Sequence, residues 1–206
     1  MINKKLVLII LIVTLLVAPL FGQSGGKYYE KGDQMFTFRA GPVIPAFFYF
    51  PYDDGETTLP FFEGTHLKVG GYGSIRYQGF VNSSLALGGE LGYYFNYDNS
   101  KELFTSVPFQ AKLTYFPLQG TFEIPLSVGV GFGYNSYSGG NKPSYFSSLF
   151  TAEVGFSWFF KENWGLTLSS GLQLYPEIYL KNHPNHAHTA LAGVMPITLS
   201  ISYRSN

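Results

Sequence analysis

The sequence contains no cysteine and few charged residues. Charged side chains make up 13% of its 206 residues, whereas an ordinary soluble domain has roughly 25%. The absence of cysteine excludes a disulfide scaffold, a cysteine zinc site and a thiol nucleophile. Basic and acidic residues number 13 each, so the formal net charge is zero. Because the chain has no excess of basic residues to bind phosphates, we expect no nucleic-acid partner.

Long apolar runs are also missing, except for one at the start of the chain. Lys4 and Lys5 precede an apolar stretch that continues to Ala18, and a Pro-Leu-Phe-Gly segment ends at Gly22. A basic start, an apolar centre and a small final residue are typical of a secretory signal peptide. The alternative, an uncleaved helical anchor, requires ~20 apolar residues. We therefore predict a signal peptide over residues 1–22 and a single domain over residues 23–206.

Aromatic residues and glycine are abundant, at 18% of the chain and 24 residues respectively. Beyond Gly32 the large apolar side chains recur with a period of two, which indicates strands. The alternating runs cover residues 36–41, 67–77, 85–95, 103–115, 122–134, 150–158, 164–174 and 197–203. Most of them exceed the ~5–6 residues of soluble strands and match the ~9–11 residues of a tilted transmembrane strand.

Charged residues within these runs all lie opposite the large apolar side chains. They are Arg39, Lys68, Arg76, Glu90, Lys112, Glu123 and Glu153. A soluble lipocalin-like barrel would turn this polar face to water, and a membrane barrel would turn it inward. The face is mostly glycine, serine, threonine and alanine, too poor in charge for a water-exposed surface. We therefore predict an all-β, antiparallel, up-and-down transmembrane β-barrel of eight strands.

The connections between the runs alternate in length. Residues 45–64, 96–102, 135–143 and 176–188 form the long set, and residues 79–83, 116–121 and 160–163 form the short set. Long outer loops and short periplasmic turns are characteristic of bacterial outer-membrane barrels. With this architecture and a last run that contains Leu199, Ile201 and Tyr203, the chain resembles the small eight-stranded outer-membrane β-barrels, the superfamily of the OmpA membrane domain, OmpX and OmpW-like proteins.

The resemblance implies a place in the bacterial outer membrane and contact with outer-membrane lipid. It also implies that the barrel-assembly machinery reads the last strand, which in this family ends in an aromatic residue. Here that residue is Tyr203, and three further residues follow it. Pro196 interrupts the last run, and because proline cannot donate to a strand ladder we expect a bulge there. We expect no cofactor.

An inward polar face would bring the seven charged residues together, since an eight-stranded barrel is just wide enough for its own side chains. An unpaired charge in such an interior is costly, so basic and acidic groups are expected to pair. We favour a narrow, salt-bridged lumen that plugs the barrel. The alternative is a gated ion path.

The first long connection is rich in aromatic residues: Phe47, Phe48, Tyr49, Phe50, Tyr52, Phe61 and Phe62. Exposed apolar patches often mark binding surfaces, here for a small hydrophobic solute or a host surface ligand. Alternatively, the rings stack on one another or on lipid. Two functions stay open: a structural or surface-interaction role, and OmpW-like passage of small hydrophobic solutes across the outer membrane.

Histidines are few and poorly placed for chemistry. His183, His186 and His188 are spaced so that they could share a divalent ion, but Pro184 lies among them and no carboxylate is adjacent, so we expect no metal site. A lipid A or phospholipid acyl hydrolase would need a histidine beside a serine. The remaining histidine, His66, has the parity of the lumen face, away from lipid. We therefore expect the protein not to be an enzyme.

Overall fold

The computed structural model describes residues 28–49, 67–97, 101–138, 144–177 and 190–205. Strands make up most of these ranges. They are β1 (Gln34–Tyr49), β2 (Gly70–Phe80), β3 (Leu85–Tyr97), β4 (Leu103–Tyr115), β5 (Phe122–Glu123), β6 (Leu126–Tyr137), β7 (Tyr145–Phe159), β8 (Trp164–Glu177) and β9 (Ala190–Ser205). No helix in the described part of the chain is long and apolar enough to cross a membrane.

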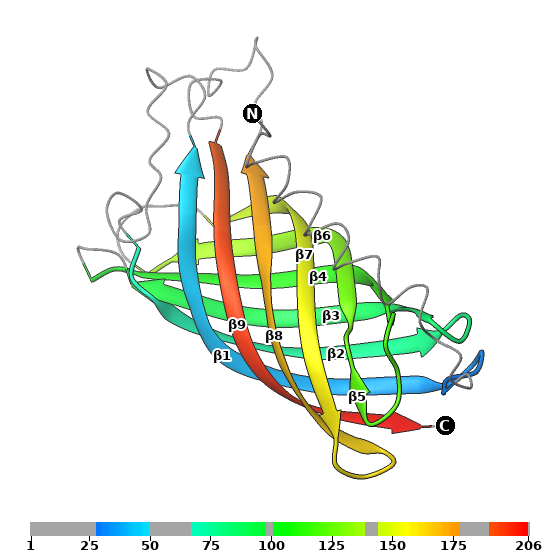
Figure 1. Cartoon of the computed structure of the whole chain (residues 1–206). Coiled ribbons are helices and arrows are strands. Elements are labelled where there is room, and N and C mark those ends of the chain that lie inside the picture. Colours follow the sequence, from blue (N-terminus) through cyan, green and yellow to red (C-terminus); the bar gives the residue numbers. More distant parts are fainter. Residues whose placement is uncertain (1–27, 50–66, 98–100, 139–143, 178–189, 206) are drawn as a thin grey trace, which may run out of the picture.

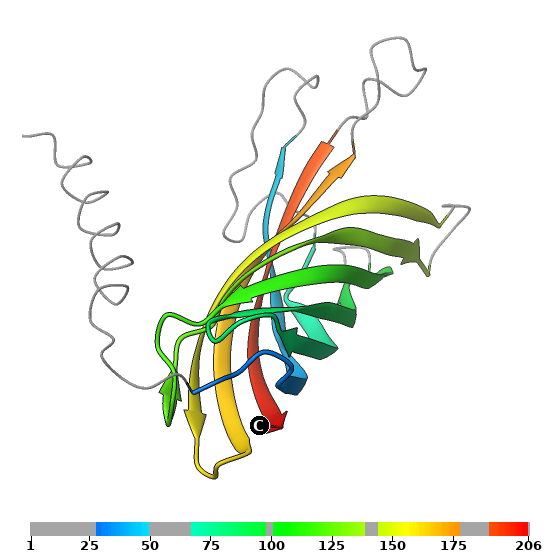
Figure 2. The same cartoon turned by 90° about the vertical axis from the view of Figure 1, so that its right-hand side faces the viewer.

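The strands form one closed antiparallel barrel. Pairing runs from β1 through β2, β3, β4, β6, β7 and β8 to β9, and β9 pairs back with β1, where Phe36 lies opposite Tyr203. In Figure 1, β1, β9, β8 and β7 run down the front, and β6, β4, β3 and β2 cross behind them. Figure 2 shows the strong curvature of the long strands. The predicted all-β, up-and-down barrel is confirmed.

The short strand β5 extends β6 and adds no separate wall. Its pairing with β7, with Phe122 opposite Trp158, is in the same register as that of β6. Ile124 and Pro125 separate β5 from β6, since proline has no amide hydrogen for the ladder. The Pro125 carbonyl still accepts a hydrogen bond of 2.9 Å from the Gly155 amide. The barrel therefore has eight strands, as predicted, with one of them interrupted.

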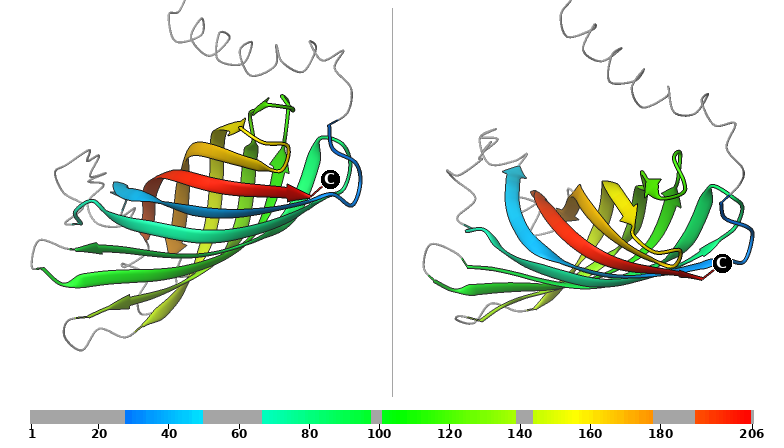
Figure 3. Two further views of the ribbon diagram at one scale, coloured as in Figure 1. Left: turned by 90° about the horizontal axis from the view of Figure 1, so that it is seen from below. Right: turned by 60° about the horizontal axis from the view of Figure 1, so that its bottom comes forward.

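The two ends of the barrel differ. At one end, called the turn end, strands are joined by residues 81–84, 116–121 and 160–163. The start of β1 and the end of β9 also lie side by side there, as the views in Figure 3 show. At the opposite end, called the loop end, β1 stops at Tyr49 and β2 begins at Gly70.

The expected bulge at Pro196 is absent. Pro196 lies opposite Val43, and the register of β9 on both of its neighbours is unchanged through this position. The register of β1 on β9 shifts instead between Pro45 and Phe47. A Cβ atom on Gly193 would lie 2.4 Å from Phe47 Cε1. Glycine at position 193 therefore makes room for the ring that follows the shift.

Side chains separate by strand parity. Large apolar side chains point outward and are exposed, for example Leu87 (54%), Val128 (55%) and Leu199 (59%). Polar and charged side chains point inward and are buried, for example Glu90 (1%) and Thr114 (0%). This distribution is the inverse of a soluble barrel and is the one that a lipid environment requires. It rules out the lipocalin-like alternative.

Candidate functional site: the barrel interior

Charged side chains from five strands meet in the middle of the barrel. They are Arg39 of β1, Arg76 of β2, Glu90 of β3, Lys112 of β4 and Glu153 of β7, together called the central layer. Each occupies an inward position of its strand, and Arg76 lies directly opposite Glu90. Because the barrel closes, Glu153 of β7 comes into contact with arginines that are far away in the sequence.

The two carboxylates of the central layer bridge its cations. Between carboxylate oxygen and guanidinium nitrogen, Glu90 lies 3.0 Å from Arg39 and 2.6 Å from Arg76. Glu153 lies 2.9 Å from each of the two arginines. Lys112 Nζ is farther away, 3.8 Å from Glu90 and 3.6 Å from Glu153. Each carboxylate is therefore shared among three cations.

Uncharged groups complete the hydrogen bonding of the central layer. The Tyr72 hydroxyl donates to Glu90 at 2.5 Å. Lys112 Nζ donates to Thr151 Oγ1 at 2.9 Å, and Thr151 in turn donates to Gln110. The side chains of Glu90 and Lys112 are almost completely inaccessible to solvent. In such an interior a charge that loses its partner is strongly destabilising, so the layer ties the strand walls together.

Two of the seven predicted lumen charges lie outside the central layer. Lys68 precedes β2, which begins at Gly70, and its side chain is exposed. Its assignment to the lumen is therefore wrong, because the alternation of the run was extended beyond the strand. Glu123 does face the interior, but near the turn end, where it pairs with Arg204 at 2.6 Å. The interior thus holds two separate groups of charges.

Aromatic side chains surround this second group of charges. The turn-end layer comprises Tyr28, Tyr29, Met35, Phe80, Ala86, Phe116, Glu123, Phe159 and Arg204. Tyr29 is fully buried, stacks on Phe80 with 3.9 Å between the ring centroids, and donates its hydroxyl to Glu123 at 2.7 Å. Burial and the Glu123 carboxylate raise the pKa of Tyr29 above its usual range. The phenol therefore keeps the proton that it donates.

Arg204 joins several segments of the turn end. Its guanidinium donates to Glu123 at 2.6 Å and to the Tyr29 hydroxyl at 3.1 Å. It also donates to the carbonyls of Gly120 at 3.1 Å and Glu162 at 2.6 Å, in two different connections between strands. One side chain of the last strand thereby holds the segment before β1 and two turns in place.

Sequence reasoning missed both Arg204 and Tyr29 as interior residues. Arg204 continues the inward parity of Ser200 and Ser202 along β9, so the alternation did contain a signal for it. Tyr29 lies before β1, and no periodic pattern includes it.

A third layer of the interior, toward the loop end, is apolar. The loop-end layer comprises Val43, Tyr72, Tyr94, Phe104, Leu149, Tyr175 and Val194. The Tyr94 ring lies 5.8 Å from the Phe104 ring and 6.0 Å from the Tyr175 ring, between centroids. Side chains therefore fill the interior at three heights.

Little free space remains between the central layer and the turn-end layer. A cavity of about 30 Å³ lies there, bordered by Met35 and Phe116 toward the turn end and by Arg76 and Glu153 toward the middle. Its wall is rich in hydroxyl groups, those of Thr37, Thr114, Ser157, Thr167, Ser169, Ser200 and Ser202. A space of this size holds about one or two water molecules.

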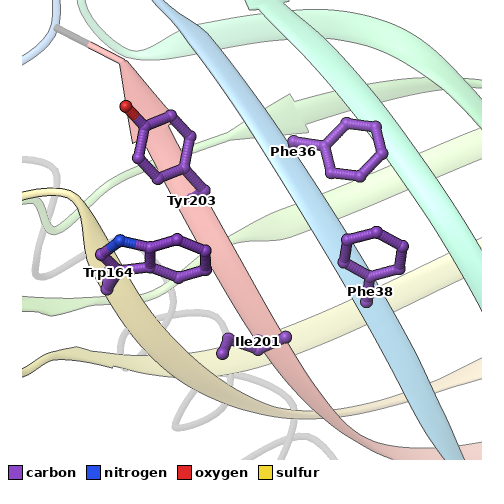
Figure 4. A pocket seen from close by; sticks show the side chains of 5 residues that line it. All are labelled: Phe36, Phe38, Trp164, Ile201 and Tyr203. Carbon is purple, nitrogen blue, oxygen red and sulfur yellow. The ribbon is translucent and has the colours of Figure 1, made fainter.

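On the outside, aromatic side chains frame a groove at the turn end (Figure 4). Phe36, Phe38, Trp164, Ile201 and Tyr203 line a space of about 320 Å³ across β1, β9 and β8. The rings of Trp164 and Tyr203 lie 5.1 Å apart between centroids. Tryptophan and tyrosine concentrate where a membrane meets water. These two rings therefore mark the edge of the lipid-facing band at the turn end.

The predicted aromatic connection is partly strand. Phe47, Phe48 and Tyr49 belong to β1 and pair with β9, so placing the start of the connection at residue 45 was wrong. The strand β1 continues past residue 45 because β9 runs on beside it and pairs with it, although the register shift after Pro45 interrupts the alternation of the two faces. The other aromatic residues predicted for this connection lie outside the described residues: Phe50, Tyr52, Phe61 and Phe62.

The histidines considered for metal binding or catalysis, His66, His183, His186 and His188, also lie outside the described residues. Within the described ranges, no three histidine, aspartate or glutamate residues are grouped as metal ligands would be. The signal peptide predicted over residues 1–22 falls outside these ranges as well.

Comparison with known proteins gives relatives in sequence and in structure. A protein-family model matches residues 20–203. An uncharacterised protein of Borreliella burgdorferi is 28% identical, with 79% of each chain covered.

Three solved structures share the fold. Neisserial surface protein A has a TM-score of 0.56 at 14% identity, covering 84% of this chain and 96% of its own. OprG from Pseudomonas aeruginosa has a TM-score of 0.52 at 10% identity, covering 88% and 100%. Ail, the attachment invasion locus protein of Yersinia pestis, has a TM-score of 0.50 at 12% identity, covering 86% and 100%. The chain therefore belongs to the family whose model matches residues 20–203, and its fold is that of the small eight-stranded outer-membrane β-barrels.

Proposed function

We propose that this outer-membrane barrel has a closed lumen and serves a structural or surface-interaction role. The central layer is the observation that carries the proposal. Its ion pairs join β1, β2, β3, β4 and β7, so they reach across the barrel from one wall to another. An ion path through the barrel would have to break contacts between groups that are buried and mutually paired.

The turn end is proposed to face the periplasm and the loop end the cell exterior. Short periplasmic turns and long outer connections are the rule for bacterial outer-membrane barrels. In this orientation the groove around Trp164 and Tyr203 meets the inner leaflet of the outer membrane. Tyr203, exposed on the outer face of β9, is then the aromatic residue that the barrel-assembly machinery reads.

Planar-bilayer recording of the purified, folded protein tests the closed lumen. The expected result is no large conductance, because charged and aromatic side chains fill the described interior at three heights and the cavity between two of these layers measures about 30 Å³. Leu87→Ala changes only the lipid-facing side and should give the same recording as the wild-type protein. Stable open channels of porin size would contradict the proposal.

In the surface-interaction role, a ligand binds to the connections at the loop end. Support comes from the fold shared with Ail, which is named an attachment protein, and from the aromatic residues between β1 and β2. A variant lacking residues 51–64 should still fold into the barrel, and bacteria that display it should adhere less to host cells. Undiminished adhesion of this variant would remove that segment as the binding surface.

A second candidate function is the passage of small hydrophobic solutes across the outer membrane. The observation that favours it is the loop-end layer, which presents apolar side chains inside the barrel above the central layer. Uptake of a small alkane by cells with and without the protein distinguishes the two functions. Faster uptake without any conductance supports passage, and equal uptake supports the structural or surface role.

A further inference from the structure

The turn end carries a feature that a closed barrel does not require. Most of the side chains of the turn-end layer belong to strands or to connections between strands. Tyr28 and Tyr29 are the two exceptions, since they precede β1. They can therefore leave the interior without breaking any pairing between strands.

We propose that residues 28–31 form a removable plug that seals a hydroxyl-lined vestibule at the turn end. The cavity of about 30 Å³ is the part of this vestibule that stays empty when the plug is in place. Its floor is formed by Arg76 and Glu153 of the central layer, and its roof by Met35 and Phe116. Met35 and Phe116 also belong to the apolar cluster in which Tyr29 is buried.

A tight turn returns the chain from the interior to the barrel wall. The Asp33 carboxylate accepts a hydrogen bond of 2.8 Å from the Glu30 amide. Gly32 has a φ of 105°, in a region that favours glycine, and its amide donates to the Phe80 carbonyl at 2.9 Å. The turn allows Tyr29 to point into the interior while Gln34 begins β1.

Arg204 holds this plug in the barrel interior. Its guanidinium donates to the hydroxyls of both tyrosines and lies over the Tyr28 ring, 4.0 Å from the centroid. The Glu123 carboxylate receives hydrogen bonds from Tyr29 and from Arg204. These contacts are polar and directional, whereas most side chains around them are apolar. Loss of the guanidinium therefore weakens the attachment of the segment, which keeps the Tyr29 contacts to Glu123 and Phe80, and leaves the strands paired.

The absence of cysteine provides a clean test by thiol labelling. Ser202 lines the cavity and is 2% exposed, and Ser205 lies three residues further along the same strand and is exposed. Ser202→Cys and Ser205→Cys are each introduced alone and treated, in folded protein, with a small charged methanethiosulfonate reagent. With the plug intact, we expect the cysteine at 202 to react far more slowly than the cysteine at 205.

The plug variants are then compared in the Ser202→Cys background. Tyr28→Ala combined with Tyr29→Ala should raise the labelling rate toward that of Ser205→Cys. Tyr77→Ala, an exposed aromatic residue on the outer face of β2, is the matched control and should leave the rate unchanged. Arg204→Gln is the second variant, in which both tyrosines remain, and it should also speed labelling.

Folding of each variant is checked first by its heat-modifiable migration, and only folded protein is scored. Unchanged protection at position 202 in the folded double-tyrosine variant or the folded Arg204→Gln variant would overturn the proposal. So would rapid labelling at 202 with the plug intact. Conductance of the same variants is recorded separately. It tests the closed lumen and not the plug, because the central layer below the vestibule still blocks the barrel when the plug is removed.

Discussion

Replacement of Glu90 by glutamine should strongly destabilise the barrel. The Glu90 carboxylate is within 4 Å of three cationic groups, on Arg39, Arg76 and Lys112. It also accepts a hydrogen bond from the Tyr72 hydroxyl. After Glu90→Gln, Glu153 alone would face those three cations. Removal of one partner from a buried ion pair costs about 3–5 kcal/mol, so we expect a loss of that size in the free energy of unfolding.

Reversible urea unfolding in lipid vesicles measures this effect. The two tryptophans, Trp158 and Trp164, are exposed on the outer face and report the transfer between lipid and water by their fluorescence. Glu30→Gln is the control, since Glu30 is exposed and a surface change of this kind shifts stability by about 0.5 kcal/mol or less. Glu90→Gln stability within that range of the wild type would refute the reasoning.

A double variant separates the charge effect from loss of packing. Lys112→Met removes one of the three cations of the central layer while keeping an aliphatic side chain. Combined with Glu90→Gln, it should cost less than the sum of the two single changes, with a coupling of about 0.5–3 kcal/mol. Strict additivity would show that the two groups do not interact.

Three further predictions concern packing, assembly and chemistry. Gly131→Ala should destabilise the barrel by about 1–3 kcal/mol in the same urea assay, because its Cβ would lie 2.0 Å from the Phe109 carbonyl oxygen. Gly79→Ala is the control: a Cβ there has no atom within 4 Å, so it should be neutral or stabilising by up to about 1 kcal/mol. Tyr203→Ser should lower the yield of folded protein in the outer membrane, measured by heat-modifiable migration, while refolding from urea in vitro stays close to normal. Mass spectrometry of lipid A and phospholipids should show the same species in cells with and without the protein, and a new acylation pattern would contradict the expected absence of enzymatic activity.

Sequence alternation predicts this fold well where a strand has one lipid face and one interior face. The run over residues 103–115 coincides with β4 (Leu103–Tyr115), because a buried polar face and an exposed apolar face alternate along its whole length. The break at Pro125 depends on a missing amide hydrogen rather than on polarity, so the period of two continued through it. Strand ends were the weakest part, since β1 continues through a register shift to Phe47 and Tyr49, whereas Lys68 keeps the inward parity of β2 but lies before that strand begins.

The interior could be predicted only in part. The inward parity of Arg39, Arg76, Glu90 and Glu153 is visible in the sequence, but their contacts depend on the closure of the barrel and on the height of each residue along it. Parity alone therefore grouped Glu123 with the others, although it lies in a separate layer with Arg204. No sequence pattern indicates that the segment before β1 turns back into the lumen.

Electrophoretic migration of unheated and boiled protein from isolated outer membranes most directly tests the central claim, that the chain forms a closed outer-membrane barrel. A closed barrel has no free strand edge and resists detergent until it is heated. We expect the unheated protein to migrate faster than the boiled protein. Identical migration of the two samples, together with recovery of the protein in the soluble fraction, would contradict the claim.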